Sequence, residues 1–347
     1  MKRVTLADIA LHAGVSRATA SLVVRETGTL SDSTRERVRA SMEELGYVYH
    51  RGAASLRGRR TQTVGFILPE LATGFWAQLS VGLEERLAEA GVVTLTVNSF
   101  DDENRQDLLY QSVLERQVDG LIVVPSSRTG LAFGDKLARG SLPTVVLSRD
   151  LRRSDIPYVG FNNVLGGRLA GEHLVTHGVR RVAYLGGLAT LALRRDRMTG
   201  LKQMLRSGEA PADVVLDLPG PSVGDWGFAT TVDLMKSGDF ADAIVCHNDA
   251  VAFGVLRALQ TSALHRPISV VSYDNVAEAA LWVPALTTVA ASGHEVGRRS
   301  ADALLSHISD PQQTPKRVLI QPHLVVRQSC GCSERVGTAH AADHAPH

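Results

Sequence analysis

Polar side chains follow several apolar runs of this sequence, at positions where they could contact a ligand. They are Glu70, Ser148, Asn248, Asp249 and Asp274. The run His247-Asn248-Asp249 holds groups for acid–base chemistry, but at a strand end the same groups serve equally to hydrogen-bond a polar ligand. The sequence has no Walker A, G-x-G-x-x-G, H-E-x-x-H or G-x-S-x-G motif. We therefore expect binding and not an enzyme, with an enzyme built on this run as the weaker alternative.

The cysteines add little evidence for a further functional site. The three cysteines Cys246, Cys330 and Cys332 are an odd number in a large chain, which argues against a disulfide framework. Cys330 and Cys332 form a C-G-C that could bind metal, but no second pair of ligands lies nearby at zinc spacing. We expect neither a metal nor a cofactor.

The elements that must position these side chains are apolar runs with the character of strands buried on both faces. They lie at residues 63–68, 92–97, 120–125, 144–148, 181–187, 243–249 and 268–274. Helical stretches separate them, for example Phe75–Ala90 and Glu103–Gln117. This alternation predicts parallel sheets, in two α/β lobes with a cleft between them. Ligands of such folds bind at the carboxyl ends of strands, where the polar residues lie.

The first 46 residues have a different pattern, typical of three short helices. Three polar residues predict their starts: Thr5 with Asp8 as a capping pair, Ser16 before a helix from Arg17 to about Val24, and Ser31 before the third. Gly46 ends the third helix.

The stretch "TLADIALHAGVSRATASLVVRE" has the spacing of a helix-turn-helix. Gly14 allows the turn, Val15 anchors it, and the small Ala10 and Ala20 let the helices cross. The second helix presents a polar N-terminal face that would meet base edges in the major groove; its members are Ser16, Arg17, Ala18, Thr19 and Ser21. The alternative is a solvated helical hairpin.

Charge is distributed unevenly, although the whole chain has a formal net charge of +1. Residues 1–60 carry 11 Lys and Arg against 6 Asp and Glu, and the remainder carries 26 against 30. Only this basic head is expected to meet a polyanion. The stretch "HRGAASLRGRR" is either a flexible linker or a short helix that forms on DNA, with Leu56 in the minor groove and arginines on phosphates.

Composition, with 44% hydrophobic and 21% charged residues, is that of an ordinary globular protein. The sequence has no apolar run long enough to span a bilayer and no secretory signal, so we expect a cytoplasmic protein associated with the nucleoid. The polar tail 331–347 is expected to be disordered.

Taken together, these motifs resemble the LacI/GalR family of bacterial transcription regulators. The resemblance covers nearly the whole chain, through "TLADIALHAGVSRATASLVV", "TRERVRASMEELGY", "VGFILPELATGFWAQLSVGLEE", "GGRLAGEHL", "RDRMTGL", "CHNDAVAFGVLRAL", "VSYDN" and "PALTTV" in the family's order. The head and linker are most similar to the maltose-regulon repressor branch, notably in "SLVVRETG", "MEELGYV" and "ASLRG".

The family resemblance implies an all-α helix-turn-helix head (1–48), a hinge helix or linker (49–61) and a two-lobed α/β core like periplasmic binding proteins (62–330). The chain would cross three times between lobe 1 (62–160 and 291–321) and lobe 2 (161–290 and 322–330). It also implies a homodimeric repressor on double-stranded, pseudo-palindromic operator DNA, with no membrane partner. A small effector in the cleft would change the angle between the lobes.

Two sets of contact residues follow from the resemblance. DNA contacts would come from Thr5, Ser16, Arg17, Ala18, Thr19, Ser21, Leu22, Arg25, Arg51, Ala53, Leu56 and Arg57. Effector contacts would come from Phe75, Trp76, Ser148, Arg149, Asn162, Arg197, Trp226, Asn248, Asp249 and Asp274. Carboxylate, amide and guanidinium groups around aromatic faces favour a sugar. A purine-type corepressor, or a sugar receptor without regulation, are the alternatives, and Trp76 and Trp226 could instead pack the lobes.

The sequence also departs from the family pattern. Ala20 stands where Val is usual, and Leu22 where Arg is frequent, so we expect a different operator preference at that base pair. His50 and Gly52 replace more typical hinge residues. Ser148 and Asn162 stand where many members carry aspartates, which makes a standard hexose pose less secure.

Overall fold

The computed structural model describes residues 4–47, 60–72, 74–207, 211–238, 241–261 and 268–331 of the chain. The chain forms two compact units, Met1–Thr61 and Gln62–His347. Most of the predicted hinge lies outside the described residues, including Arg51, Ala53, Leu56 and Arg57, and so does the predicted tail after residue 331.

The first unit holds three helices: α1 Leu6–His12, α2 Arg17–Val24 and α3 Asp32–Glu44. The three predicted starts are confirmed. Thr5 and Asp8 form a reciprocal capping box, and the side chains of Ser16 and Ser31 accept hydrogen bonds from the amides of Thr19 and Thr34. The helices share a small core of buried side chains, made of Ile9, Ala10, Ala13, Ala20, Val23 and Val38.

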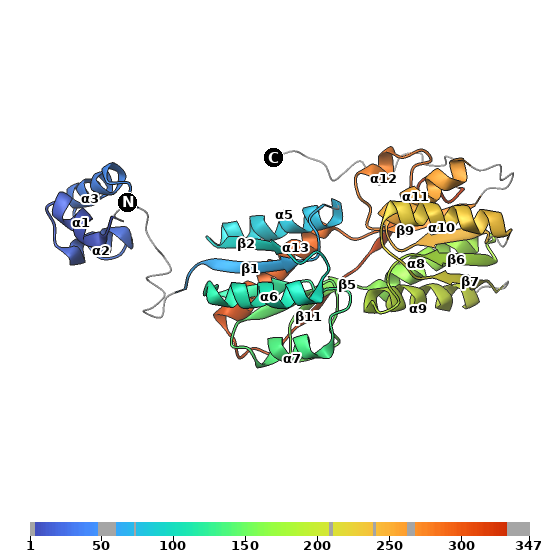
Figure 1. Ribbon diagram of the computed structural model, residues 1–347, viewed down its shortest axis with the longest axis horizontal. Helices are drawn as coiled ribbons and strands as arrows, with labels where there is room; N and C mark the ends of the chain where they lie inside the picture. Colours follow the sequence, from blue (N-terminus) through green and yellow to red (C-terminus); the bar gives the residue numbers. More distant parts are fainter. Residues whose placement is uncertain are drawn as a thin grey trace. The chain divides into compact units, whose positions relative to one another are not determined.

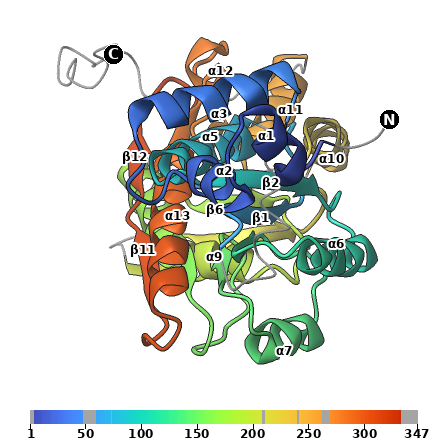
Figure 2. The same ribbon diagram turned by 90° about the vertical axis from the view of Figure 1, so that its left-hand side faces the viewer.

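The second unit contains two lobes, each built on a six-stranded sheet (Figure 1). Lobe 1 has the strand order β11-β5-β4-β3-β1-β2, and all of its pairs are parallel. Its strands are β1 Thr63–Leu68, β2 Val93–Asn98, β3 Gly120–Val123, β4 Thr144–Leu147, β5 Tyr158–Phe161 and β11 Arg317–Ile320. Helices cover both faces, α5 Gly74–Glu89 with α13 Gly293–Ser309 on one, and α6 Glu103–Glu115 with α7 Leu131–Arg139 on the other (Figures 1 and 2).

Lobe 2 repeats this plan with the strand order β12-β10-β9-β8-β6-β7. Its strands are β6 Arg181–Leu185, β7 Asp213–Leu218, β8 Ala243–Cys246, β9 Ser269–Tyr273, β10 Thr287–Ala290 and β12 His323–Val325, of which only β12 pairs antiparallel among the described residues. Helices α8 Asn163–Thr176 and α9 Ala192–Ser207 pack on one face, and α10 Gly224–Ser237 and α11 Asp249–Gln260 on the other. The short helix α12 spans Glu278–Leu281.

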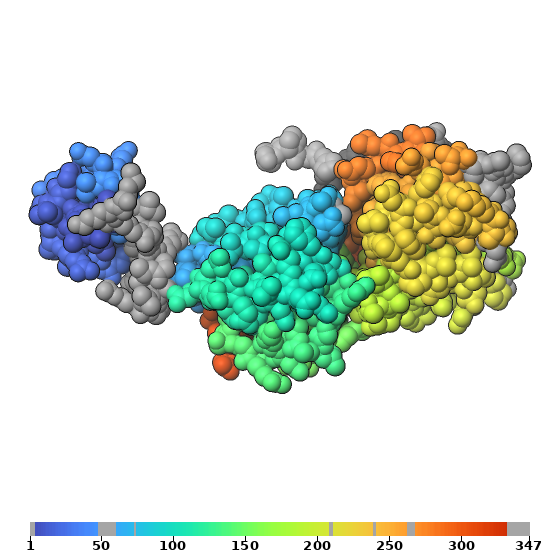
Figure 3. Space-filling model, in the orientation of Figure 1, coloured from blue at the N-terminus to red at the C-terminus, as the bar shows by residue number. Residues whose placement is uncertain are grey.

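The chain passes between the lobes at three places: after β5, after β10 and after β11. Each lobe has its own apolar core, and the surface is indented where the lobes meet (Figure 3). The carboxyl ends of parallel strands lie along the same edge of a sheet. In both lobes this edge, together with the crossing segments, borders the indentation.

The α/β class predicted from the sequence is confirmed, but the strand prediction was incomplete. All seven predicted runs contain a strand, whereas β5, β7, β10, β11 and β12 were not located from the apolar pattern. Four of these have only 3 or 4 residues, and β7 alternates exposed and half-buried positions. Neither pattern is a continuous apolar run. In the described part of the chain, no helix is long and apolar enough to cross a membrane.

Candidate DNA-binding face and ligand pocket

Helix α2 is held so that its first turn faces outward from the head. Gly14 adopts a φ of 62°, and the amide of Val15 bonds back to the Ala10 carbonyl at 2.9 Å, which closes the turn before α2. Ala20 and Val23 are buried against the other helices. The opposite side of α2 is therefore left for solvent or a partner.

The predicted contact residues on this side differ in availability. Ser16, Arg17 and Ala18 are exposed, and Thr19 and Ser21 are half-buried. The Ser16 hydroxyl is engaged with Thr19, at 2.8 Å between the two oxygens, while Thr5 is engaged in its capping box. Arg17 is thus the exposed cation nearest the N-terminus of α2, where side chains of a reading helix reach base edges.

Leu22 and Arg25 lie on the same helix but are turned toward the protein. The Leu22 side chain packs 3.3 Å from the position of a β-carbon on Gly28, whose φ of 79° turns the chain after α2. Arg25 bonds the Ser21 carbonyl at 2.8 Å and also contacts the Ser21 hydroxyl. With both bonds in place, Arg25 keeps three of its five N–H donors for a DNA contact.

A pocket lies between the lobes of the core and contains about 290 Å³ of empty space. It is lined by Phe75, Phe161, Asn162, Asn163, Gly166, Arg197, Tyr273, Asp274, Val289, Ala291 and Pro322. These residues come from both lobes and from all three crossing segments. Among the ten predicted effector contacts, the structure brings four together here: Phe75, Asn162, Arg197 and Asp274.

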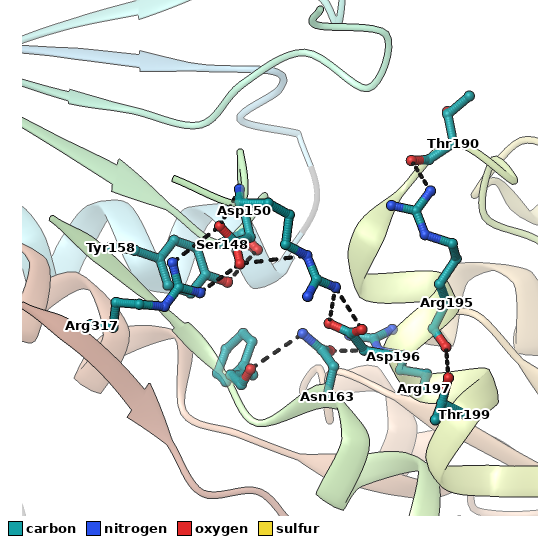
Figure 4. Close-up of polar contacts among 12 residues, drawn as sticks. Ser148, Asp150, Tyr158, Asn163, Thr190, Arg195, Asp196, Arg197, Thr199 and Arg317 are labelled. Atoms are coloured by element: carbon teal, nitrogen blue, oxygen red, sulfur yellow. Dashed lines mark hydrogen bonds and ion pairs between the residues drawn. The ribbon is translucent and has the colours of Figure 1, made fainter. Parts of the chain in front are cut away.

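Arg197 is the central cation of the pocket and is buried in the first half of α9. Its Nε donates to Asn163 Oδ1 at 3.0 Å, and its Nη1 donates to the His247 carbonyl at 2.6 Å. The guanidinium also stacks over the Tyr273 ring at 4.1 Å (Figure 4 shows Arg197 beside Asn163). A guanidinium has five N–H donors, and the two hydrogen bonds to these described residues use two of them. Three donors are therefore available for a ligand.

Asp274 and Tyr273 place two more polar groups at the pocket. Burial raises the pKa of Asp274 to about 8, with the Asp249 charge adding to the effect and Arg197 opposing it. Among the described residues, none donates a hydrogen bond to the Asp274 carboxyl group, and the buried Tyr273 hydroxyl likewise has no partner there. A ligand hydroxyl would satisfy both groups.

The lobe 1 side of the pocket is aromatic. The Phe75 ring lies 5.6 Å from that of Phe161 and 5.0 Å from that of Trp76, measured between centroids. Phe75 and Phe161 line the pocket, whereas Trp76 packs against the lobe 1 core. Asn162 caps α8, bonding the Leu165 amide at 3.1 Å through its Oδ1.

The predicted run His247-Asn248-Asp249 is used by the fold itself. Asn248 caps α11, and Asp249 accepts hydrogen bonds from the Val276 amide at 2.9 Å and the Thr288 hydroxyl at 2.8 Å. Burial and nearby arginines hold the pKa of His247 well below its usual range. The imidazole is enclosed by the protein, and its lowered pKa favours the neutral form.

Three other predicted effector residues lie away from this pocket. The Trp226 indole packs on Gly220 and the lobe 2 core beside α10 and α11. Ser148 is buried with a φ of 60° and accepts the Tyr158 hydroxyl on its carbonyl at 3.0 Å. Arg149 contacts Asp101 and lines a second, more polar hollow of about 780 Å³ between segments 125–134, 149–153 and 190–195.

Ion pairs join the lobes beside the pocket (Figure 4). Arg152 of lobe 1 donates from Nη2 to both carboxylate oxygens of Asp196 in lobe 2, at 2.6 and 2.8 Å. Arg317, on β11, reaches Asp150 at 2.6 Å, and Asp150 lies 3.8 Å from Arg152 Nε. Asp196 is the residue before Arg197 in the sequence. These ion pairs therefore connect the neighbour of Arg197 with β11, the strand that precedes the third crossing between the lobes.

Sequence reasoning missed Phe161, Asn163 and Tyr273 as pocket residues. Each is adjacent in sequence to a polar residue at a strand end or helix start, so the signal was present as "FNN" and "SYD". Successive side chains of β5 and β9 point to opposite faces of the sheet, and this decides which of two adjacent residues faces the pocket. In addition, the short β5 was not located from the sequence.

The two units define a class of protein: a helix-turn-helix head joined to a two-lobed ligand-binding core. Residues 5–49 match the model of bacterial regulatory proteins of the lacI family, and residues 172–330 match that of the periplasmic binding protein-like domain. The chain is 28% identical to the maltose regulon regulatory protein MalI of Escherichia coli over 93% of this chain and 98% of that protein. It is 30% identical to the transcriptional regulator CelR of Thermobifida fusca over 94% and 98%.

Solved structures give the same assignment. The lac repressor dimer bound to operator and the anti-inducer ONPF matches with a TM-score of 0.84 and 28% identity, covering 95% of this chain and 99% of that one. A CelR–cellobiose complex matches with a TM-score of 0.71 and 28% identity, covering 94% and 100%. The chain belongs to the LacI family of transcription regulators. These relatives are regulators and not enzymes, in agreement with the expectation of binding without catalysis.

Proposed function

We propose that this protein is a dimeric repressor whose affinity for a pseudo-palindromic operator is set by a small polyhydroxylated ligand in the pocket between the lobes. The ligand assignment rests on the buried Arg197 and Tyr273 and the half-buried Asp274, which line the pocket together with Phe75 and Phe161 or lie beside these two rings. Hydroxyl groups would meet the unused polar atoms, and the apolar face of a sugar ring would pack on the aromatic rings.

The regulatory part of the proposal rests on the head and on the comparisons. Arg17 and the first turn of α2 are exposed as a reading surface, and the basic linker sequence would add phosphate contacts and the Leu56 wedge. The matched lac repressor was solved as a dimer on operator, and the matched CelR with cellobiose. The protein would act in the cytoplasm on the nucleoid.

Operator binding is tested by fluorescence anisotropy with duplexes from the region upstream of the protein's own gene. We expect specific binding that weakens steeply with salt, and about 10-fold or more loss in Arg17→Ala. Arg116→Ala, on the exposed end of α6 in the core, is the matched control and should bind as the unaltered protein does. Equal affinity for operator and random duplex at moderate salt would overturn the proposal.

The ligand class is tested by adding mono- and disaccharides, and separately purine bases, to the operator complex. A sugar that releases operator, and that no longer does so in Arg197→Lys, supports the proposal. Tightening of the complex by a purine would instead establish a corepressor.

A further inference from the structure

A second cluster of ligand atoms lies in lobe 2, apart from the pocket. It consists of His173 and His177 at the end of α8 and Cys330 in the segment after β12. One nitrogen of each histidine and the Cys330 sulfur all lie within 4.8 Å of one another. Cys330 contacts the start of β9, since Ser269 Oγ donates to the Cys330 carbonyl at 2.8 Å. The cluster is therefore at the amino ends of the strands, whereas the pocket is at their carboxyl ends.

From this geometry we propose that His173, His177 and Cys330 bind a divalent transition-metal ion of the zinc class. Two imidazoles and a thiolate are the donor set that such ions prefer. Bond lengths of about 2.0–2.3 Å to tetrahedral zinc require ligand atoms roughly 3.5 Å apart. Side-chain rotations that move the ligand atoms by about 1 Å would bring them to this separation. The i, i+4 spacing puts both rings on one face of α8, with centroids 4.6 Å apart.

The surroundings suit a cation and a thiolate. The site lies at the C-terminal end of a 14-residue helix, where the backbone carbonyls carry partial negative charge. Thr287 Oγ1 donates to Cys330 Sγ at 3.2 Å, the kind of bond that orients and stabilises a metal-bound sulfur.

Burial differs among the three ligands in a way that allows entry of an ion. Cys330 is buried in the lobe 2 core, His173 is half-buried and His177 is exposed. An ion would enter beside His177 and join the segment that contains Cys330 to α8. Three protein ligands leave a fourth position for water or another donor. Cys332 lies outside the described residues, and the proposal does not depend on it.

The test is a cobalt titration of the full-length protein after metal removal. We expect one Co²⁺ per chain, with a thiolate-to-cobalt charge-transfer band, and displacement of Co²⁺ by Zn²⁺ with a rise in thermal stability. Cys330→Ser should abolish the band. His177→Gln, at an exposed position that does not endanger folding, should weaken Zn²⁺ binding about 10-fold or more in competition with a chromogenic chelator.

Two control variants sharpen this test. His294→Gln replaces an exposed histidine of lobe 1 and should leave metal binding unchanged. Cys332→Ser should retain the band, and a partial loss there would add a fourth ligand to the same site. The proposal is overturned if the unaltered protein shows no thiolate band, or if the band survives in Cys330→Ser, which would place the metal on another cysteine.

Discussion

At the scale of single residues, the polar groups of the cleft divide into those that the fold uses and those that it leaves for a ligand. Asn248 and Asp249 have their hydrogen bonds satisfied by α11, Val276 and Thr288. Asp274 lies at the pocket without such donors among the described residues, beside Arg197. The sequence could place all three at strand ends, but hydrogen-bond partners distant in sequence decided which remained available.

Asp274→Asn is expected to raise the free energy of unfolding of the ligand-free protein above that of the unaltered protein, by an amount that grows as the pH rises from about 4 to 8. Burial raises the pKa of Asp274 from 3.8 to about 8, so the folded state retains a proton that the unfolded chain releases in this window. The unaltered protein therefore loses stability as the pH rises toward 8, whereas asparagine cannot ionise. Urea denaturation should give the variant an advantage of about 1–3 kcal/mol at pH 8 and little at pH 4.

The control for this prediction is Asp233→Asn, at a side chain that is 78% exposed on α10. It should change the stability little at either pH. A difference between Asp274→Asn and the unaltered protein that stays constant from pH 4 to 8 would contradict the assigned burial of the charge.

At the scale of elements, glycines set the distance between paired helices in both lobes. A β-carbon on Gly167 of α8 would lie 2.0 Å from the Arg197 carbonyl on α9, and one on Gly254 of α11 would lie 2.0 Å from the Gly224 carbonyl on α10. Gly82 of α5 meets the His294 carbonyl of α13 at 2.1 Å in the same way. The fragments "GGRLAGEHL" and "VAFGVLRAL" contain Gly167 and Gly254, but only the packed helix pairs show why a side chain cannot fit there.

Sequence prediction was most successful where local chemistry suffices. The starts of α1, α2 and α3 could be predicted because each cap bonds within three residues of itself. The short strands β10, β11 and β12 could not be located from apolar pattern, since they exist through pairing with distant strands. The pocket depends on those strands and crossings, so only part of its lining was predictable.

Gly167→Ala is expected to destabilise lobe 2 by about 2–4 kcal/mol, because a methyl group would force α9 away from α8. Arg197 moves with α9, so ligand affinity should fall in the same variant. Differential scanning calorimetry with and without the sugar measures both effects. Gly130→Ser adds a side chain where nothing lies within 4 Å and should leave both unchanged. An unaltered melting temperature in Gly167→Ala would contradict close packing of the pair.

At the scale of the whole core, the lobes are joined by three crossings and by the ion pair of Arg152 with Asp196. An effector controls such a molecule only if it prefers one arrangement of the lobes over another. A contact that exists in one arrangement and must break in another contributes to that balance. The Arg152–Asp196 pair is such a contact, since its two residues lie on different lobes and next to the pocket arginine.

Arg152→Gln and Asp196→Asn are each expected to weaken operator binding without effector by less than about 5-fold, because a half-exposed ion pair contributes at most about 1 kcal/mol. The direction follows from the likeness of this fold to the operator-bound lac repressor: losing the pair lowers the population of the binding arrangement. Less sugar should then suffice for release. The double variant should bind operator no more weakly than either single variant in anisotropy titrations, and high salt should abolish the difference from the unaltered protein.

Arg139→Gln is the control: it breaks an exposed pair with Asp135 inside lobe 1 and should change neither operator binding nor the response to sugar. Tighter operator binding by both single variants would mean that the pair stabilises the released arrangement instead.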